Sequence, residues 1–343
     1  MGMGKPEISI VVPMYNSSRF VEACIDSILA QDFRDFELIL IDDNSTDNTI
    51  AICQRYLQDE RVSLLVNNKG KGVSSARNLG ISNSRGGYIT FIDSDDIVAK
   101  SFLSELINVA KSHPDYLAMC SYCTFSESEP NFDMSISSGL TEISSDVLLA
   151  NIFYYHSSGW GCLFRKDLID IYDIRMEESA SFNEDIYFTC KYISICKGGM
   201  NSCNKFYGYR INPDGIGANK RHSDLTETDV IHRSRGYLAF QDALNFCKRN
   251  APENYKFIDI GYSFIAAEVM LTAARAKIRD FELKKDIKKH LSFSYCLRYL
   301  RKSNNIFQKL LVVGIAVSPT AVKCILDIFD LLKRLRRKEP IFS

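Results

Sequence analysis

The sequence predicts an α/β fold in which a mostly parallel sheet is covered by helices. Short apolar runs alternate with amphipathic segments along the first 111 residues. Such alternation implies right-handed βαβ crossovers. Acidic clusters follow two of the runs, at positions 42–43 and 93–96. Because ligands of open parallel sheets bind beyond the carboxyl ends of the strands, we expect a binding site at this edge.

The predicted strands are uninterrupted apolar runs at residues 8–12, 36–41, 62–66 and 88–92. Continuous rather than alternating hydrophobicity is typical of strands that are buried on both faces. Pro13 ends the first run, and the second is followed by an Asp-Asp-Asn-Ser-Thr-Asp turn that leads into a helix cap.

The predicted helices follow these strands and repeat apolar residues with a helical period. They begin near positions 21, 50, 74 and 101. The side chains that mark their inner faces are Val21, Cys24, Ile25, Ile28, Ile50, Cys53, Leu57, Leu103, Leu106, Ile107 and Ala110.

The rest of the chain changes character twice. Residues 119–219 are more irregular, with many aromatic residues and loops, whereas residues 225–338 look almost wholly helical. We therefore place a boundary near 215–225, with one domain over residues 1–220 and a helical region over residues 221–343.

Composition narrows the class of protein. The 42 basic residues balance the 42 acidic residues, which gives no electrostatic reason to bind nucleic acid. Cys120 and Cys123 lack the second pair that a zinc site requires, so we expect them in or beside a strand. No signal peptide is recognised, and no apolar run reaches the ~18–20 residues needed to span a bilayer. A cytoplasmic protein with free thiols is expected.

The Asp-Ser-Asp-Asp segment at 93–96 is a candidate metal site. Three carboxylates within four residues repel one another unless a cation or hydrogen-bond donors compensate. If the backbone stays extended, Asp93 and Asp95 face the same side, and Mg²⁺ commonly takes such carboxylates together with substrate phosphates. The alternative is a helix cap, which suits Asp96 but not Asp93.

The turn after the first run, at residues 13–18, lacks the glycines of the dinucleotide fingerprint. Lys-Gly-Lys-Gly at 69–72 is not a Walker loop either. The phosphates of a bound nucleotide would therefore be neutralised mainly by a metal. Tyr15 is placed to stack on a base, with Asp43 accepting a hydrogen bond from it. Alternatively, Tyr15 is a rim residue that packs on the next helix.

Four segments of the chain resemble family 2 glycosyltransferases of the GT-A fold. They are ISIVVPMYN at 8–16, FELILIDDNSTD at 36–47, GVSSARNLGI at 72–81 and YITFIDSDD at 88–96. They occur in the family's order and spacing, and the resemblance fades after the first third of the chain. It implies a GT-A catalytic domain that binds a nucleotide-diphosphate sugar.

The resemblance implies roles at matching positions. Pro13, Tyr15 and Asp43 match positions around the nucleotide base, and Arg77 lies in the stretch that lines the sugar-donor site.

Asp93, Ser94 and Asp95 match the family's Asp-x-Asp element. Asp95 is the expected direct metal contact, with Asp93 at the sugar donor and metal, and Asp96 either supports the loop or shares the ion. The implied cofactor is Mn²⁺ or Mg²⁺.

Glu184 and Asp185 form a second candidate element within FNEDIYF at 182–188. Acids are also common at helix N-termini because of the macrodipole. The pair resembles the family's acid pair, and Asp185 matches the base that deprotonates the acceptor hydroxyl. A carboxylate with a near-normal pKa would be ionised at pH 7, the state that a base requires.

Trp160 and Arg210 complete the candidate sugar-donor contacts. The family often has a Trp-Asn-Lys-Leu stretch here, and this chain departs from it at Gly161 and Cys162. Trp160 either forms the floor of the sugar pocket or packs in the core. The segment at 207–216 resembles the family's closing strand and loop, which places Arg210 at the phosphates and makes the loop a lid. His222 is not assigned to the metal.

The C-terminal segment combines apolar stretches at 310–317 and 324–332 with a basic tail at 333–338. An amphipathic helix with a basic run is attracted to an anionic membrane surface, here the cytoplasmic face of the inner membrane. The alternative is a helical subdomain or homodimer interface with a solvated basic end.

The sequence thus predicts an inverting glycosyltransferase that uses a UDP-sugar or a similar donor. Its acceptor would be a glycan or lipid-linked acceptor in the synthesis of a bacterial capsule, O-antigen or exopolysaccharide. One alternative is a nucleotidyltransferase of similar fold, which calls for a glycine- and lysine/arginine-rich loop after the first strand. The other is a non-catalytic nucleotide-sugar-binding module, against which the retained acids argue.

Overall fold

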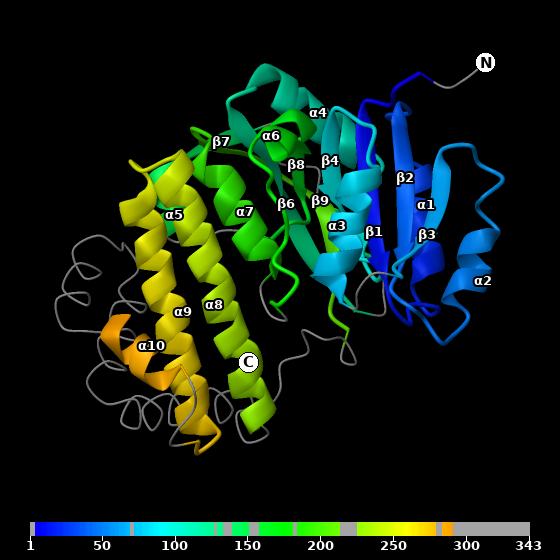
Figure 1. The fold of residues 1–343 in the computed structure, drawn as a ribbon. Helices are drawn as coiled ribbons and strands as arrows, with labels where there is room; N and C mark the ends of the chain where they lie inside the picture. The colour runs from blue at the N-terminus through cyan, green and yellow to red at the C-terminus, as the bar shows by residue number, and fades with distance from the viewer. Residues whose placement is uncertain are drawn as a thin grey trace, which may run out of the picture.

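The computed structural model describes residues 4–68, 72–126, 129–132, 139–150, 158–180, 184–212, 225–278 and 283–290. Within them, nine strands form one mixed sheet in the order β3-β2-β1-β4-β8-β6-β9-β5, and β7 pairs with β9. Figure 1 shows the N-terminal strands at one end of the molecule and the long helices α8 (Glu227–Asn250) and α9 (Tyr255–Arg275) at the other.

The N-terminal half of the sheet is parallel, as the sequence predicted. It consists of β1 (Ile8–Met14), β2 (Phe36–Asp42), β3 (Val62–Val66) and β4 (Tyr88–Phe91). Strand β1 lies between β2 and β4, and β3 is added outside β2. Every residue of β1 and β2 is buried, which confirms that their continuous apolar runs belong to strands covered on both faces.

The predicted helices cover this half of the sheet. They are α1 (Val21–Leu29), α2 (Thr49–Gln54), α3 (Val73–Asn83) and α4 (Phe102–Ser112), and the inward residues predicted for α1 and α4 are buried. The prediction for the second helix was wrong at its end. Helix α2 stops at Gln54, and Leu57 lies beyond it in a turn with 44% of its surface exposed.

The middle of the chain is more regular than predicted. It forms β5 (Ile97–Val98), β6 (Tyr116–Phe125), β7 (Leu140–Ser144), α5 (Ser145–Ala150), β8 (Cys162–Arg165), α6 (Lys166–Ile171), α7 (Glu184–Ser194) and β9 (Gly198–Arg210). Strands β6 and β9 pair in parallel, with register shifts on both sides of Ser121. Such irregularities interrupt the two-residue period by which strands are recognised. Cys120 and Cys123 lie on β6, as expected.

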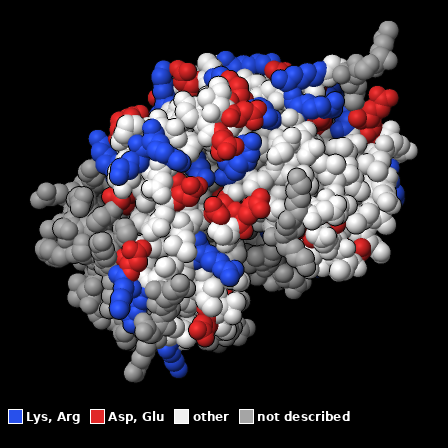
Figure 2. Space-filling view, in the orientation of Figure 1, with Lys and Arg blue, Asp and Glu red and all other residues white. Residues whose placement is uncertain are grey.

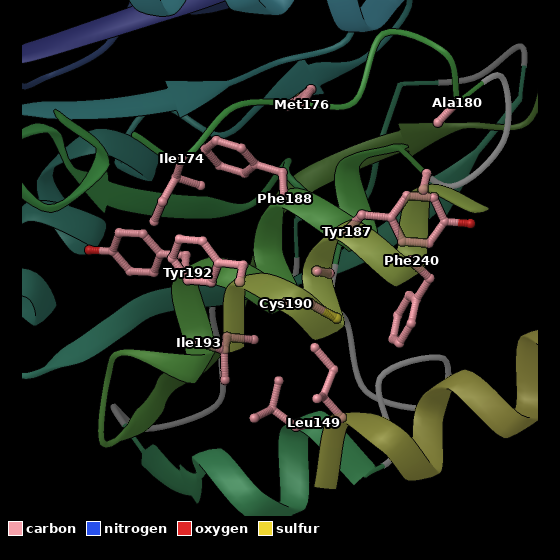
Figure 3. Packing of buried hydrophobic residues seen from close by; sticks show 14 of the residues in the cluster. Leu149, Ile174, Met176, Ala180, Tyr187, Phe188, Cys190, Tyr192, Ile193 and Phe240 are labelled. Atoms are coloured by element: carbon pink, nitrogen blue, oxygen red, sulfur yellow. The ribbon is translucent and has the colours of Figure 1, made fainter. Parts of the chain in front are cut away.

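The described C-terminal helices pack directly on this sheet domain. Tyr187 of α7 meets Phe240 of α8 edge to face, with ring centroids 5.5 Å apart, and Figure 3 shows Leu149 of α5 in the same cluster. Helix α10 (Lys284–His290) packs on α9. The predicted boundary at 220 and the apolar and basic C-terminal stretches lie outside the described residues.

Two surface properties bear on the predicted partners. On the face drawn in Figure 2, Lys and Arg side chains are interspersed with Asp and Glu. Among the helices of the described residues, none combines the length and hydrophobicity required to cross a membrane.

Candidate active site

The acidic loop that follows β4 is the centre of the candidate site. Its residues 93–96 form a tight turn, because the Asp96 N–H donates to the Asp93 carbonyl at 3.0 Å. The backbone is therefore not extended here, so the condition under which Asp93 and Asp95 would face the same side is not met. Ser94 is buried in this turn, and its hydroxyl lies 2.7 Å from that of Ser17, which follows β1.

Asp96 is the buried anchor of the turn. One carboxylate oxygen accepts a hydrogen bond from the Tyr207 hydroxyl at 2.7 Å, and the other accepts one from the Arg210 N–H at 2.7 Å. Burial, together with the charges of Asp93 and Asp95, raises its pKa well above the ordinary value. Helix α4 begins only after Ser101, so Asp96 does not cap it. Of the two predicted roles, this geometry favours support of the loop over sharing the ion.

Among the acids of this loop, Asp95 has the least offset of its carboxylate charge by the described hydrogen-bond donors and cations. Its carboxylate accepts a hydrogen bond from the Asn212 amide at 3.3 Å, and the Arg210 guanidinium bonds instead to the Asp95 main-chain oxygen. Burial and the charge of Asp93 raise the pKa of Asp95. A divalent cation would offset this repulsion, and carboxylate oxygens are the ligands that Mg²⁺ and Mn²⁺ prefer.

The residues present fit a metal that is completed by substrate. The described residues contain no group of three side chains able to hold a metal ion. Mg²⁺ is commonly bound by one or two carboxylates, with phosphates and water completing its shell. Asp95 and the neighbouring Asp93 provide these one or two carboxylates.

Arg77 of α3 is bound to two acids. Its Nη2 donates to Asp93 at 2.7 Å and its Nη1 donates to Glu184 at 2.8 Å, while only 5% of its side chain is exposed. Burial alone would lower its pKa, but Asp93 and Glu184 outweigh burial and raise the pKa. In the described structure the Arg77 guanidinium thus pairs with two other residues of the site, and its contact with a sugar donor stays a prediction.

Asp185 stands at the start of α7, next to Glu184. One of its oxygens accepts a hydrogen bond from the Gly159 N–H at 3.3 Å. Burial, and secondly the charge of Glu184, raise its pKa to about 6, with Arg77 acting in the opposite direction. The expectation of a near-normal pKa was wrong, although the carboxyl is still mostly ionised at pH 7.

The loops after β1 and β2 form the part of the site predicted to hold the base. Pro13 is buried within β1, whereas Tyr15 is 55% exposed beyond the strand end. Asp43 accepts hydrogen bonds from the Asn67 amide at 2.8 Å and from the Gly72 N–H at 2.6 Å. Tyr15 is therefore free of the core, while Asp43 already serves as a local anchor.

Trp160 packs into an aromatic group beside the acidic turn. It is 8% exposed and stacks on Tyr207 and Tyr209, with centroid distances of 4.6 and 5.3 Å. Tyr122 meets the indole edge to face at 5.2 Å. Gly161 follows with a φ of 68°, a backbone conformation that favours glycine. The indole therefore belongs mainly to the packed wall of the site.

The Arg210 side chain binds the main chain of the acidic turn. Its Nε donates to the Asp95 carbonyl at 2.7 Å and its Nη1 to the Ser126 carbonyl at 3.0 Å. The guanidinium also lies over the rings of Phe20 and Phe125. The predicted lid at 213–216 and His222 lie outside the described residues.

Three functional positions were missed by the sequence reasoning. Tyr207 donates to Asp96, and its hydroxyl accepts from the Asp93 N–H at 3.2 Å. Asn78 binds the main chain of Met176 through both of its polar side-chain atoms, each at 2.9 Å.

The third missed position is Asn16, which has a φ of 48° and accepts a hydrogen bond from the Thr46 N–H at 2.8 Å. The available signals were the tolerance of Asn for positive φ and the alternation of Tyr207 with Tyr209.

Comparisons with known proteins indicate the family that the chain resembles. The model of "Glycosyl transferase family 2" matches residues 9–170. Glycosyltransferase GlyG of Streptococcus pneumoniae serotype 4 is 39% identical over 126 residues, which cover 36% of this chain and 42% of GlyG. A GalNAc(5)-diNAcBac-PP-undecaprenol beta-1,3-glucosyltransferase of Campylobacter jejuni is 31% identical over 185 residues, covering 53% and 56% of the two chains.

The comparisons also define the fold and the extent of the match. The crystal structure of S. aureus TarS 1–349 in complex with UDP-GlcNAc aligns with a TM-score of 0.59 at 18% identity, covering 92% of this chain and 89% of that one. The fold is therefore GT-A, as the sequence predicted. The chain spans between 30% and 63% of the length of the first curated relatives it matches. Residues 9–170 therefore match glycosyl transferase family 2, and the similar proteins support a place for the chain in that family.

Proposed function

We propose that this protein is an inverting glycosyltransferase that uses a UDP-sugar or similar nucleotide-diphosphate sugar. One observation carries the proposal. Arg77 joins Asp93, at the end of β4, to Glu184, the neighbour of Asp185. This contact supports the proposal that the predicted sugar-donor loop and the predicted general base form one site.

The diphosphate end of the sugar donor would lie at the acidic turn. Asp95, with Asp93 beside it, would hold Mn²⁺ or Mg²⁺, and Asp96 fixes the turn through Tyr207 and Arg210. When bound, the metal supplies positive charge that offsets the charge developing on the leaving diphosphate. Tyr15 and Asp43, at the ends of β1 and β2, would contact the base.

Asp185 would act as general base for the acceptor hydroxyl. A base works best with a pKa close to the operating pH, and a pKa of about 6 leaves this carboxylate both ionised and basic at pH 7. Attack from the face opposite the leaving diphosphate inverts the anomeric carbon. An α-linked sugar donor would therefore give a β linkage.

The class of acceptor follows from relatives rather than from the described residues. The Campylobacter relative is named for a glycan on an undecaprenol diphosphate, and TarS is named for poly(ribitol-phosphate). We therefore infer a glycan or lipid-linked acceptor in bacterial polysaccharide synthesis, reached from the cytoplasmic side of the membrane.

The test is a binding and turnover panel of UDP-glucose, UDP-galactose, UDP-GlcNAc and GDP-mannose. Each would be measured with Mn²⁺, Mg²⁺ or EDTA, by thermal shift and by nucleotide release. Wild type should bind at least one sugar donor in a metal-dependent way, and Asp95→Ala should lose that dependence. Asp185→Asn should keep binding while turnover falls by about 10²–10⁴-fold.

A matched control is Asp115→Asn, which removes an exposed acid paired with Lys197. It should behave as wild type. Full turnover by Asp185→Asn would remove the base assignment, and the absence of binding to any sugar donor with either metal would overturn the proposal.

A further inference from the structure

We propose that Arg77 is a positioning residue. It holds the predicted sugar-donor loop at residues 93–96 at a fixed distance from α7, the helix that carries the predicted general base, Asp185. This rests on the proposed function, and it differs from the expectation that Arg77 binds the sugar donor itself. The residue acts through Asp93 and Glu184, which it joins from the buried face of α3.

The geometry of Arg77 leaves it little freedom. Two different terminal nitrogens are used, Nη2 for Asp93 at 2.7 Å and Nη1 for Glu184 at 2.8 Å. The two carboxylates come from segments 16 and 107 residues away in sequence. A planar guanidinium fixes the directions of both bonds, which a lysine ammonium does not. Arg77 therefore sets the distance between the end of β4 and the start of α7.

Helix α3 is itself held firmly, so it can serve as a reference. A Cβ at Gly80 would lie 2.3 Å from Val11 Cγ1, which shows that the helix backbone sits directly on β1. On the other side, Asn78 binds the main chain of Met176, in the segment that leads toward α7. Adjacent residues of α3 thus bind both Met176 and the first residue of α7.

Charge gives Arg77 a second effect on the base. Asp185 is surrounded by the charges of Glu184, Arg77 and Asp93, with the buried thiol of Cys162 also nearby. Arg77 is the cation in this set, and it is shared among three carboxylates. Loss of its charge favours the protonated form of Asp185, whereas loss of the Glu184 charge favours the ionised form.

The experiment compares Arg77→Gln, Arg77→Lys, Glu184→Gln and the double variant Arg77→Gln/Glu184→Gln in the full chain. UDP affinity, kcat, KM for the sugar donor and the pH dependence of kcat/KM would be measured. Arg85→Gln is the matched control, because Arg85 pairs with the buried Glu37 away from the acidic turn.

We expect Arg77→Gln to lower kcat by about 10²-fold, the effect typical of small misplacement, with little change in UDP affinity. Arg77→Lys should recover part of that loss. The acidic limb of the pH profile should move to higher pH in Arg77→Gln and to lower pH in Glu184→Gln. The double variant should lose no more activity than the worse single variant, because the two residues act as a unit.

The opposite pattern would overturn the proposal. A large loss of UDP affinity with unchanged kcat would make Arg77 a sugar-donor ligand. If Arg77→Gln does not fold, the Glu184→Gln variant is the test. A wild-type kcat in Glu184→Gln, with the acidic limb of its pH profile unmoved, would count against the proposal. If the wild type transfers no sugar, the proposed function fails. The coupling between Arg77 and Glu184 is tested separately: it is rejected if Arg77→Gln and Glu184→Gln have additive effects on the free energy of unfolding.

Discussion

At the scale of single residues, three neighbouring aspartates share one turn but have different partners. Asp96 is satisfied by Tyr207 and Arg210, and Asp93 is paired with Arg77. Asp95 accepts a side-chain hydrogen bond from the Asn212 amide at 3.3 Å, and its carboxylate is not paired with a cation as closely as that of Asp93 is. The repulsion anticipated from their spacing is therefore relieved unequally, which leaves Asp95 as the position best suited to a cation.

The pH dependence of transfer should report on Asp185. Its carboxyl must be deprotonated to accept a proton, and burial raises its pKa to about 6. The rate should therefore fall as the pH decreases through about 6, rather than through the ordinary aspartate range near 4. A profile of kcat/KM between pH 5 and 8, with saturating Mn²⁺, would measure it. A rate that stays flat down to pH 5 would contradict the assignment.

Tyr207→Phe tests the support of the acidic turn. The change removes a hydroxyl that donates to Asp96 and accepts from the Asp93 N–H, leaving a buried carboxylate oxygen unpaired. We expect a loss of about 1–3 kcal/mol in the free energy of unfolding, measured by urea denaturation. Tyr172→Phe, in a partly exposed tyrosine that packs on Phe246, is the control. Equal stability of the two variants would show that the Tyr207 hydroxyl is dispensable.

At the scale of elements, α3 connects both halves of the candidate site. Gly72, which precedes its first turn, donates a hydrogen bond to Asp43. The middle of the helix carries Arg77 and Asn78, and its last turns lie on β1. Ala76 and Ile81 of this helix are buried in the core, and its close contact with β1 requires that Gly80 carry no side chain. The position of the site therefore depends on close backbone packing as well as on hydrophobic burial.

Gly80→Ala should disturb this packing. The new Cβ would lie 2.3 Å from Val11 Cγ1 and 2.9 Å from Val11 Cγ2. Overpacking typically costs about 1–3 kcal/mol, partly offset by the better helix propensity of alanine, up to ~1 kcal/mol. We expect a net loss of stability in urea denaturation and a partial recovery in Gly80→Ala/Val11→Ala.

Gly87→Ala is the control for Gly80→Ala, because its Cβ would meet the Glu7 carbonyl at an ordinary 3.7 Å. If Gly80→Ala were as stable as Gly87→Ala, α3 would have room to shift.

At the scale of the whole molecule, the helices beyond residue 225 share a core with the sheet domain. Tyr187 packs on Phe240, and Lys191 of α7 is paired with Asp242 of α8 while it also donates to the Arg175 carbonyl. These contacts reach the helix that begins with Glu184 and Asp185. The helical region therefore supports the helix that carries the predicted general base, Asp185.

Removal of that region should unfold the rest. A chain of residues 1–220 would expose the side of α7 that faces α8, including Tyr187 and Cys190, which are buried in the intact structure (Figure 3). We expect it to lose near-ultraviolet circular dichroism and a sharp thermal transition, whereas residues 1–290 keep both. A sharp transition in the shorter chain would establish residues 1–220 as an independent domain.

Much of this could be predicted from local pattern. Continuous apolar runs predicted β1 and β2, and the helical period predicted the buried faces of α1 and α4. The motifs also singled out Asp93 and Glu184, which Arg77 contacts in the structure. Patterns failed where the period was interrupted, in the bulged strand β6, and where a helix ended early, before Leu57.

By itself, the sequence determined the parallel half of the fold, the family resemblance and the edge of the sheet that carries the acids. These depend on residues that lie close together in the chain. Only the tertiary structure decided the role of each acid. Arg77 meets Glu184 across 107 residues, and Tyr207 meets Asp96 across 111. Burial, charge pairing and pKa depend on such distant neighbours, which no local pattern contains.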